Sequence, residues 1–309
     1  MARVFIDGSV GTTGLRIFER LEKRTDIELI CLSDTERKDI SARKAAYNIA
    51  DVAFMCLPDD ASKEAVSLVE NPNTVLIDTS TAHRVAEGWV YGFAELAGQR
   101  KRIANAKRIA NPGCHATGFI SLVAPLVSCG IILPELELSC FSLTGYSGGG
   151  KKMIGEYNEK AGDLLFTAPR MYGLCQTHKH LPEMQKYTGL KKSPIFMPIV
   201  SPYYAGMEVV VPLHASQISG NFEAICERYR CVYGNGLVKF NDTADENGFM
   251  SAAAFAGRDD MELSVFGNGE KILLVSRFDN LGKGASGSAI QNMNLVLGLD
   301  ETTGLKLGG

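Results

Sequence analysis

The sequence predicts an α/β protein: a doubly wound parallel-sheet domain, followed by an α+β domain with a mixed, largely antiparallel sheet. Apolar strands alternate with helices up to about residue 80, and a glycine-rich turn separates the first strand from the first helix. After residue 114 strands outnumber helices. The alternation of strands and helices in the first half is typical of a parallel sheet that helices cover on both faces.

The elements of the first half follow from apolar runs bounded by turn residues. Strands are expected over Arg3–Asp7, Ile27–Ser33, Val52–Leu57 and Thr74–Asp78, and helices over Leu15–Lys23, Ser41–Tyr47 and Ala61–Val69. The strands are apolar at successive positions, so we expect both faces of their sheet to be buried.

The second half is expected to hold more strands than helices. Strands are predicted over Leu136–Thr144, Pro194–Val200, Glu208–His214, Leu237–Phe240, Glu262–Gly267 and Lys271–Asp279, and helices over Lys151–Ala161, Leu181–Thr188 and Phe222–Tyr233. The apolar pattern of Ala285–Leu299 predicts a last helix that returns to pack on the first domain. We therefore expect one domain made of residues 1–113 and 284–309, and a second made of residues 114–283.

The composition is that of an ordinary globular protein. Of its 309 residues 45% are hydrophobic and 22% charged, and the net charge of −3 gives no reason to expect nucleic-acid or membrane partners. Eight cysteines lie scattered without paired spacing, so we expect reduced thiols and a cytoplasmic location without a signal peptide. The uncharged stretch Ala116–Pro134 is broken by Pro125 and Gly130, which favours a buried helix over a membrane span.

The turn after the first strand has the spacing G-x-x-G-x-x-G, a variant of the dinucleotide-binding fingerprint. Glycine lets the backbone approach a pyrophosphate held at a helix N-terminus. The predicted contacts are Gly8, Ser9, Gly11, Thr12, Thr13 and Gly14. A glycine-rich turn without any nucleotide is the alternative.

The end of the second strand should decide between NAD and NADP. Asp34 would suit a free ribose 2′-hydroxyl, whereas Arg37 or Lys38 would pair with a 2′-phosphate, assisted by Ser33. We favour NADP(H), with a solvated loop as the alternative. Ligands gather where strands of such a sheet end, which adds Pro58 and Ser80 to the predicted cofactor contacts.

Two further segments are predicted to contact ligands. Arg84, beyond the fourth strand, could hold a carboxylate or phosphate, or could be a surface arginine. The run from Asn280 to Gly284 joins the last strand to the last helix. Its small residues would allow a flat nicotinamide ring to approach, so Asn280 and Gly284 are predicted cofactor contacts.

Cys114 is the predicted nucleophile. It follows Asn111-Pro-Gly and opens the apolar segment Phe119–Cys129, which is how a helix N-terminus looks in sequence. The helix dipole and the unpaired N–H groups there stabilise a thiolate. A buried, inert helix cysteine is the alternative.

Two imidazoles and a carboxylate lie close together in His178-Lys-His180-Leu-Pro-Glu183. Either histidine could pair with the thiolate and act as acid or base, oriented by Glu183. In an extended segment the two histidines would point opposite ways. Zinc bound by Cys and His is the rival interpretation, as are two surface histidines, and we predict no metal site.

The segment Gly145–Lys152 satisfies G-x-x-x-x-G-K, but Lys152 stands where a P-loop needs Ser or Thr. A nucleotide triphosphatase is therefore not predicted. The N–H groups of this loop, with Ser147, Gly148 and Lys151, could still bind one phosphate group of a substrate.

Together these motifs resemble N-acetyl-γ-glutamyl-phosphate reductase of arginine biosynthesis, in its shorter type, within the semialdehyde dehydrogenase superfamily. The resemblance runs from Gly8 almost to the C-terminus. It is carried by Asn111-Pro-Gly-Cys-His-Ala-Thr-Gly, His178-Lys-His-Leu-Pro-Glu-Met, Ser147-Gly-Gly-Gly, the Asn280–Asn294 segment, and Asp78–Arg84 followed by Trp89-Val-Tyr-Gly-Phe-Ala-Glu-Leu.

The resemblance implies NADPH-dependent reduction of an acyl phosphate to an aldehyde through a thioester on Cys114. His178 or His180 would be the acid/base, Asn111 would belong to the substrate site, and Arg84 or Lys151 would assist phosphate departure. Residues 114–283 would form the catalytic and oligomerisation domain of a homodimer or homotetramer. His115 departs from the longer type, which usually has an aromatic residue there. An aspartate-semialdehyde dehydrogenase-like enzyme and a non-catalytic nucleotide-binding protein remain the alternatives.

Overall fold

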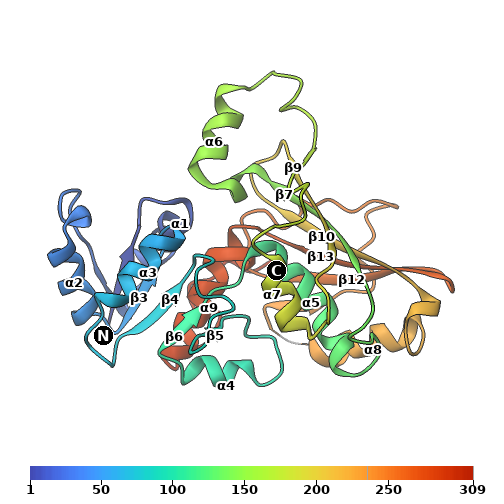
Figure 1. The fold of residues 1–309 in the computed structure, drawn as a ribbon, viewed down its shortest axis with the longest axis horizontal. Helices are drawn as coiled ribbons and strands as arrows, with labels where there is room; N and C mark the ends of the chain where they lie inside the picture. Colours follow the sequence, from blue (N-terminus) through green and yellow to red (C-terminus); the bar gives the residue numbers. More distant parts are fainter. Residues whose placement is uncertain (235, 309) are drawn as a thin grey trace. The chain divides into compact units, whose positions relative to one another are not determined.

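The computed structural model describes residues 1–234 and 236–308 and divides the chain into two compact units (Figure 1). Unit 1 consists of residues 1–113 and 285–305. Unit 2 consists of residues 114–284 together with the segment that begins at Lys306. The predicted combination of a doubly wound domain with a mixed-sheet domain is confirmed.

Unit 1 contains a parallel six-stranded sheet of order β2-β1-β3-β4-β6-β5. Its strands are β1 Ala2–Asp7, β2 Ile27–Ile30, β3 Val52–Met55, β4 Val75–Asp78, β5 Val90–Tyr91 and β6 Arg108–Ala110. Its helices are α1 Thr12–Leu21, α2 Ile40–Ile49, α3 Asp59–Ser67, α4 Gln99–Ala104 and α9 Gly287–Val296. The strand order reverses between β1 and β3, which is where doubly wound sheets bind ligands.

Apolar side chains fill both sides of this sheet. Successive residues of a strand point to opposite faces. Accordingly Val4 and Ile6 belong to one apolar cluster, and Phe5, between them, belongs to another. The first cluster also contains Ile290 and Met293 of α9, so the last helix packs within unit 1.

Unit 2 contains a mixed seven-stranded sheet of order β11-β12-β13-β10-β7-β9-β8. Its strands are β7 Ser139–Gly145, β8 Arg170–Met171, β9 Ile195–Ser201, β10 Met207–His214, β11 Val238–Phe240, β12 Met261–Gly267 and β13 Lys271–Phe278. The helices are α5 Cys114–Ser128, α6 Gly150–Glu159, α7 Leu181–Thr188 and α8 Phe222–Val232. The strand expected from Leu136 begins only at Ser139, because a turn closes with the Leu136 N–H on the Leu133 carbonyl.

The uncharged stretch is the buried helix α5. Every residue from His115 to Leu126 is buried, and the helix packs on α7, α8, β10 and β13. At Gly118 a Cβ atom would lie 2.4 Å from the Val209 side chain, so glycine lets α5 approach the sheet closely. Among the described residues no helix is both long and apolar enough to cross a membrane.

Candidate active site

Cys114 is the first residue of α5 and is partly exposed. The helix dipole therefore favours its thiolate, as the sequence predicts. A Cβ atom at Gly284 would lie 2.9 Å from the Cβ of Cys114, so a glycine here lets the chain pass against the nucleophile. The segment Gly282–Ser286 that contains it is a short π-helix leading into α9.

His115 lies beside the thiol at the centre of a hydrogen-bonded chain. Its Nδ1 is 2.6 Å from the Ser142 hydroxyl oxygen, and its Nε2 is 2.7 Å from the Tyr172 hydroxyl oxygen. Burial, and then the neighbouring His178, hold the pKa of His115 well below its usual value. The neutral ring therefore donates to one of these hydroxyls and accepts from the other.

Tyr172 is the member of this chain that the charge of Cys114 affects. Burial raises the pKa of Tyr172 above its usual value, and the charge of nearby Cys114 raises it further. The phenol is thus a neutral hydrogen-bonding group close to the thiol. Sequence reasoning missed Ser142 and Tyr172, and treated His115 only as a departure from the longer type. The available signal was a histidine in the first turn of an apolar helix, which needs buried hydrogen-bonding partners.

His178 and His180 do not point to opposite sides, and that prediction was wrong. Their ring centroids are 4.8 Å apart, and they lie 5.6 and 5.4 Å from the ring of His115. The reason is local: the segment forms a turn, closed by the Leu181 N–H on the His178 carbonyl, rather than an extended strand. Both rings therefore lie on the same side of the chain.

The two histidines differ in their surroundings. His180 is buried, and its Nε2 lies 4.0 Å from Oε1 of Glu183, which is 1% exposed. His178 is partly exposed, and its Nδ1 accepts a hydrogen bond of 3.3 Å from the backbone N–H of His180. A carboxylate beside an imidazole orients the ring and favours its charged form. His180 has this arrangement with Glu183.

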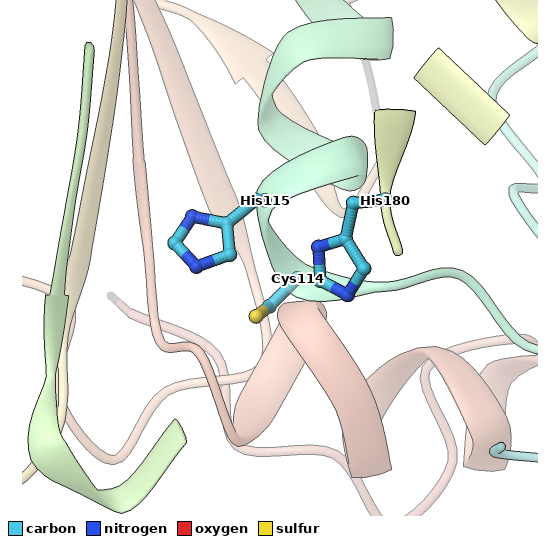
Figure 2. Close-up of side chains that lie close together, drawn as sticks. All are labelled: Cys114, His115 and His180. Atoms are coloured by element: carbon cyan, nitrogen blue, oxygen red, sulfur yellow. The ribbon is translucent and has the colours of Figure 1, made fainter. Parts of the chain in front are cut away.

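The sulfur of Cys114 lies between two imidazole rings (Figure 2). One potential ligand atom from each of Cys114, His115 and His180 lies within 4.8 Å of the others. This trio combines a thiol with two imidazoles, a set able to exchange protons or to bind a soft cation. Two parts of the chain supply these groups: the start of α5 and the turn before α7.

The phosphate site expected in the glycine-rich loop of unit 2 is corrected in part. The N–H groups of Gly145, Tyr146 and Ser147 donate to the carbonyls of Gly206, Tyr203 and Tyr204, so they are not available to a phosphate. The Ser147 side chain is buried and accepts a hydrogen bond from Asn280. Gly148 and Lys151 are exposed and remain the accessible members of the predicted set.

Asn280 and Gly284, predicted as cofactor contacts, both lie in unit 2. The amide of Asn280 is used within that unit, since Nδ2 donates to Ser147 and Oδ1 accepts from the Gly206 N–H. Asn280 therefore ties the glycine-rich loop to the end of β13. The small-residue run serves close packing, including the approach of Gly284 to Cys114.

The glycine-rich turn of unit 1 has the shape expected of a dinucleotide site. Gly8 has φ +84°, and a Cβ atom there would lie 2.3 Å from the Cys56 carbonyl oxygen. A Cβ atom at Gly14 would lie 2.3 Å from the Gly8 carbonyl oxygen. The residues between, including Gly11, Thr12 and Thr13, are only partly buried, so the turn is accessible to a ligand.

A cavity of about 220 Å³ adjoins this turn, with Asp7, Ser9 and Arg37 among its lining residues. The Arg37 guanidinium forms an ion pair with Asp34. Ser33 donates its backbone N–H to Glu36, and Ser33 and Lys38 are exposed. Asp34, which would repel a 2′-phosphate, is thus paired with Arg37, which would attract one.

The loop after β4 is organised around a buried carboxylate. Asp78 accepts hydrogen bonds from both the N–H and the hydroxyl of Ser80, and His83 Nδ1 lies 2.6 Å from it. The His83 ring stacks on Trp89 with a centroid separation of 4.0 Å. Of the two cofactor contacts predicted here, Ser80 is buried, with 8% of its surface exposed. Pro58, at the end of the loop after β3, is exposed.

Arg84 and Asn111, predicted as substrate contacts, are both buried within unit 1. The Arg84 guanidinium donates to the backbone carbonyls of Asn111 and Thr79. Asn111 donates to the Ala285 carbonyl and accepts from Asn292. These contacts hold the chain between β6 and α5 in place, and a direct role in substrate binding stays a prediction.

Comparison with known proteins places both units in one family. Residues 3–106 match the semialdehyde dehydrogenase NAD binding domain, and residues 114–280 match the semialdehyde dehydrogenase dimerisation domain. The N-acetyl-gamma-glutamyl-phosphate reductase 2 of Nostoc sp. is 43% identical over 98% of this chain and 99% of its own length. The N-acetyl-gamma-glutamyl-phosphate reductase of Brucella ovis is 45% identical over 96% of this chain and 99% of its own.

Solved structures share the fold at low sequence identity. Aspartate semialdehyde dehydrogenase II of Vibrio cholerae, complexed with ASA, has a TM-score of 0.75 at 18% identity, covering 96% of this chain and 98% of its own. Aspartate semialdehyde dehydrogenase with NADP from Candida albicans has a TM-score of 0.65 at 14% identity, covering 96% of this chain and 98% of its own.

Proposed function

The chain belongs to the N-acetyl-γ-glutamyl-phosphate reductases of the semialdehyde dehydrogenase family, and from that premise we propose how it works. It uses NADPH to reduce N-acetyl-γ-glutamyl phosphate to N-acetyl-L-glutamate 5-semialdehyde and phosphate, in the cytoplasm. The observation that carries the proposal is the nucleophile at the start of α5, which shares one cluster with the buried pair His180–Glu183.

The first step is attack by the Cys114 thiolate on the acyl carbon. A sulfur–carbon bond forms, the carbon–oxygen bond to phosphate breaks, and the acyl group remains on Cys114 as a thioester. Backbone N–H groups at the start of α5 stabilise the developing oxyanion, and each such donor contributes roughly 3 kcal/mol. The helix N-terminus thus serves both the thiolate and the oxyanion.

We assign the acid/base role to His180 rather than to His178. His180 takes the proton of the Cys114 thiol and gives it to the departing phosphate. Its position in the cluster with Cys114 and its carboxylate neighbour Glu183 support this role. His178 is less suited, because its Nδ1 already accepts the backbone N–H of His180.

The turn of unit 1 fits the pyrophosphate of a dinucleotide, because glycines at positions 8 and 14 leave space that a Cβ atom would fill. Gly8–Gly14 would hold the pyrophosphate, and Ser33, Arg37 and Lys38 the adenosine end. When bound, NADPH supplies the hydride that reduces the thioester carbon. The oxyanion left on Cys114 would take a proton from solvent to become the hemithioacetal. The hemithioacetal would then collapse to the aldehyde and the thiolate, with its hydroxyl proton passing to His180.

NADP preference is the finer part of the cofactor proposal. A 2′-phosphate would compete with Asp34 for the Arg37 guanidinium, with Lys38 exposed nearby. Arg37→Ala should lower kcat/KM for NADPH by about tenfold, the size expected for one charge-assisted contact, and leave kcat/KM for NADH unchanged. Equal use of both cofactors by the wild type would overturn NADP preference.

The uncovered face of the unit 2 sheet supports self-association as a homodimer or homotetramer. Phe141, Ile195 and Leu273 are exposed by 39, 64 and 42%. Phe141 and Leu273 flank Val210 and Pro212 of β10 in the strand register, on the face opposite α5. Phe141→Glu should therefore give monomers in sedimentation experiments, and an unchanged sedimentation coefficient would contradict this interface.

The test of the reaction runs it backwards. Purified protein receives NADP, phosphate and either N-acetylglutamate semialdehyde or aspartate semialdehyde, and NADPH formation is followed by absorbance. We expect turnover of the acetylated substrate alone, and none with Cys114→Ala. Turnover of aspartate semialdehyde would overturn the substrate assignment, and no turnover of either would favour a non-catalytic protein.

A further inference from the structure

We propose that Cys114, His115 and His180 form an inhibitory binding site for a thiophilic divalent cation, of which Zn²⁺ is the best match. One sulfur and two imidazole nitrogens lie within 4.8 Å of one another, and Figure 2 shows the sulfur between the two rings. Thiolate and imidazole are the ligands that zinc prefers in proteins. The reaction proposed above uses no metal, so the cation acts as an inhibitor.

The trio needs little movement to close on an ion. Bond lengths of about 2.3 Å to sulfur and about 2.0 Å to nitrogen place tetrahedral ligand atoms roughly 3.5 Å apart. Binding requires the Cys114 and His180 side chains to rotate, so that atoms now up to 4.8 Å apart reach that separation. Three protein ligands leave the fourth position open to water, as in many zinc sites.

The surroundings of His180 suit a metal-bound imidazole. Its Nε2 lies 4.0 Å from the buried carboxylate of Glu183. In zinc sites a carboxylate commonly accepts the hydrogen bond of the imidazole nitrogen that does not bind the metal, which orients the ring and strengthens the bond. Nδ1 of His180, on the other side of the ring, is then the ligand atom.

His115 can join only by giving up a hydrogen bond. Its Nε2 bonds the Tyr172 hydroxyl at 2.7 Å, and Figure 2 shows this end of the His115 ring turned toward the Cys114 sulfur. The cation therefore has to displace Tyr172 from Nε2. The Ser142 hydroxyl at Nδ1 remains as the orienting partner.

Binding is a simple exchange of a proton for the cation. The Cys114 thiol loses its proton, a sulfur–metal bond forms, and one proton is released for each ion bound. The sulfur lone pair that would attack the acyl carbon is then engaged in the metal bond. Inhibition, unlike binding, rests on the function proposed above.

Cobalt is the probe, because Co²⁺ in a zinc site has visible bands and thiolate ligation adds a charge-transfer band in the near ultraviolet. Full-length protein is titrated with CoCl₂, and ZnCl₂ is then added to displace it. We expect a charge-transfer band that Cys114→Ala abolishes, and an affinity that His180→Gln lowers at least tenfold. A band that survives in Cys114→Ala, or an affinity unchanged in His180→Gln, would overturn the proposal.

Two further variants exclude general effects of mutation. Tyr172→Phe removes the competitor for His115 Nε2 and should raise cobalt affinity severalfold, an outcome that damage to the fold would not produce. Cys175→Ser, a matched control, removes an exposed thiol that is not part of the trio and should change nothing. Weaker binding in Tyr172→Phe would contradict the use of His115 Nε2.

Activity separates this inference from the proposed function. Micromolar ZnCl₂ should stop NADPH formation in the reverse assay, and EDTA should restore it. Cobalt binding that depends on Cys114, in a protein that does not turn over N-acetylglutamate semialdehyde, would support the cation site and refute the function. Normal turnover that ZnCl₂ leaves unaffected would support the function and refute the inhibitory cation site.

Discussion

Unit 1 makes room for a ligand by omitting side chains, whereas unit 2 brings side chains together around a nucleophile. At Gly8 and Gly14 an added Cβ atom would lie 2.3 Å from a carbonyl oxygen. Around Cys114 three imidazoles, a phenol and a carboxylate gather from separate parts of the chain. The site in unit 1 depends on the shape of the backbone, and the site in unit 2 depends on which side chains surround Cys114.

This difference has a consequence for mutation. Side chains added to unit 1 should weaken cofactor binding and leave the chemistry intact. Side chains exchanged in unit 2 should weaken the chemistry and leave cofactor binding intact. Substitutions in the two units should therefore have separable effects on cofactor binding and on kcat.

The largest effect is expected from exchanging the acid/base. His180→Gln should lower kcat by about 10²- to 10⁴-fold, the usual contribution of general acid–base catalysis. The matched variant His178→Gln should cost far less, since the assigned acid/base is His180, whose Nε2 lies 4.0 Å from Glu183. Steady-state rates of both variants, with NADPH binding unchanged, test the assignment, and equal losses in the two would refute it.

Gly8→Ala should weaken cofactor binding without touching Cys114. The position has φ +84° and no room for a methyl group, and strain of about 1–3 kcal/mol corresponds to a roughly 5- to 150-fold rise in the Kd for NADPH. Titration by cofactor fluorescence measures it. Gly88→Ala is the control, because Gly88 has φ +77° with nothing within 4 Å. Similar Kd values for the two variants would show that the turn does not bind the cofactor.

His115→Phe should affect both stability and rate in unit 2. The Ser142 and Tyr172 hydroxyls would lose their partner, which costs about 1–3 kcal/mol of unfolding free energy, and Tyr172 would no longer be held beside Cys114. We expect kcat to fall about tenfold with an unchanged KM. Ser142→Ala removes only one of the two bonds and should cost less. A fully active His115→Phe would contradict a positioning role.

The smallest effect is a dependence of stability on pH. The pKa of His115 lies well below its usual 6.5 in the folded protein, so the unfolded chain takes up a proton first as the pH falls. Keeping the buried His115 neutral therefore costs nothing above about pH 6.5. Below that pH the unfolding free energy falls by up to about 1.4 kcal/mol per pH unit. Urea unfolding at several pH values should show a shallower slope for His115→Phe than for the wild type. Identical pH slopes for the two proteins would mean that burial does not lower the pKa of His115.

The same contrast explains what could be predicted from the sequence. The glycine turn and Cys114 were predictable because each is a local pattern next to a strand or helix boundary. The short elements α4, β5 and β6 were not, because runs of two to six residues carry too little periodicity. The chain Ser142–His115–Tyr172 could not be predicted, because its members lie 27 and 57 residues apart in sequence.

Arg84 and Asn280 show the opposite limit. A charged or amide side chain near a strand end suggests ligand binding, but here each makes hydrogen bonds within its own unit. Such partners depend on which loops meet in the folded chain, and no spacing rule reveals them. Residue type alone therefore does not reveal which polar atoms are already used within the fold, and a ligand contact by either residue stays a prediction.

If the reaction passes through a thioester on Cys114, a burst experiment will detect it. N-acetylglutamate semialdehyde and NADP are mixed with the protein in the absence of phosphate, so that acylation can occur but the acyl group has no phosphate acceptor. We predict a burst of one NADPH per chain, with the N-acetylglutamyl adduct located on Cys114 by peptide mass spectrometry. NADPH formation without an adduct, or an adduct on another cysteine, would contradict the account.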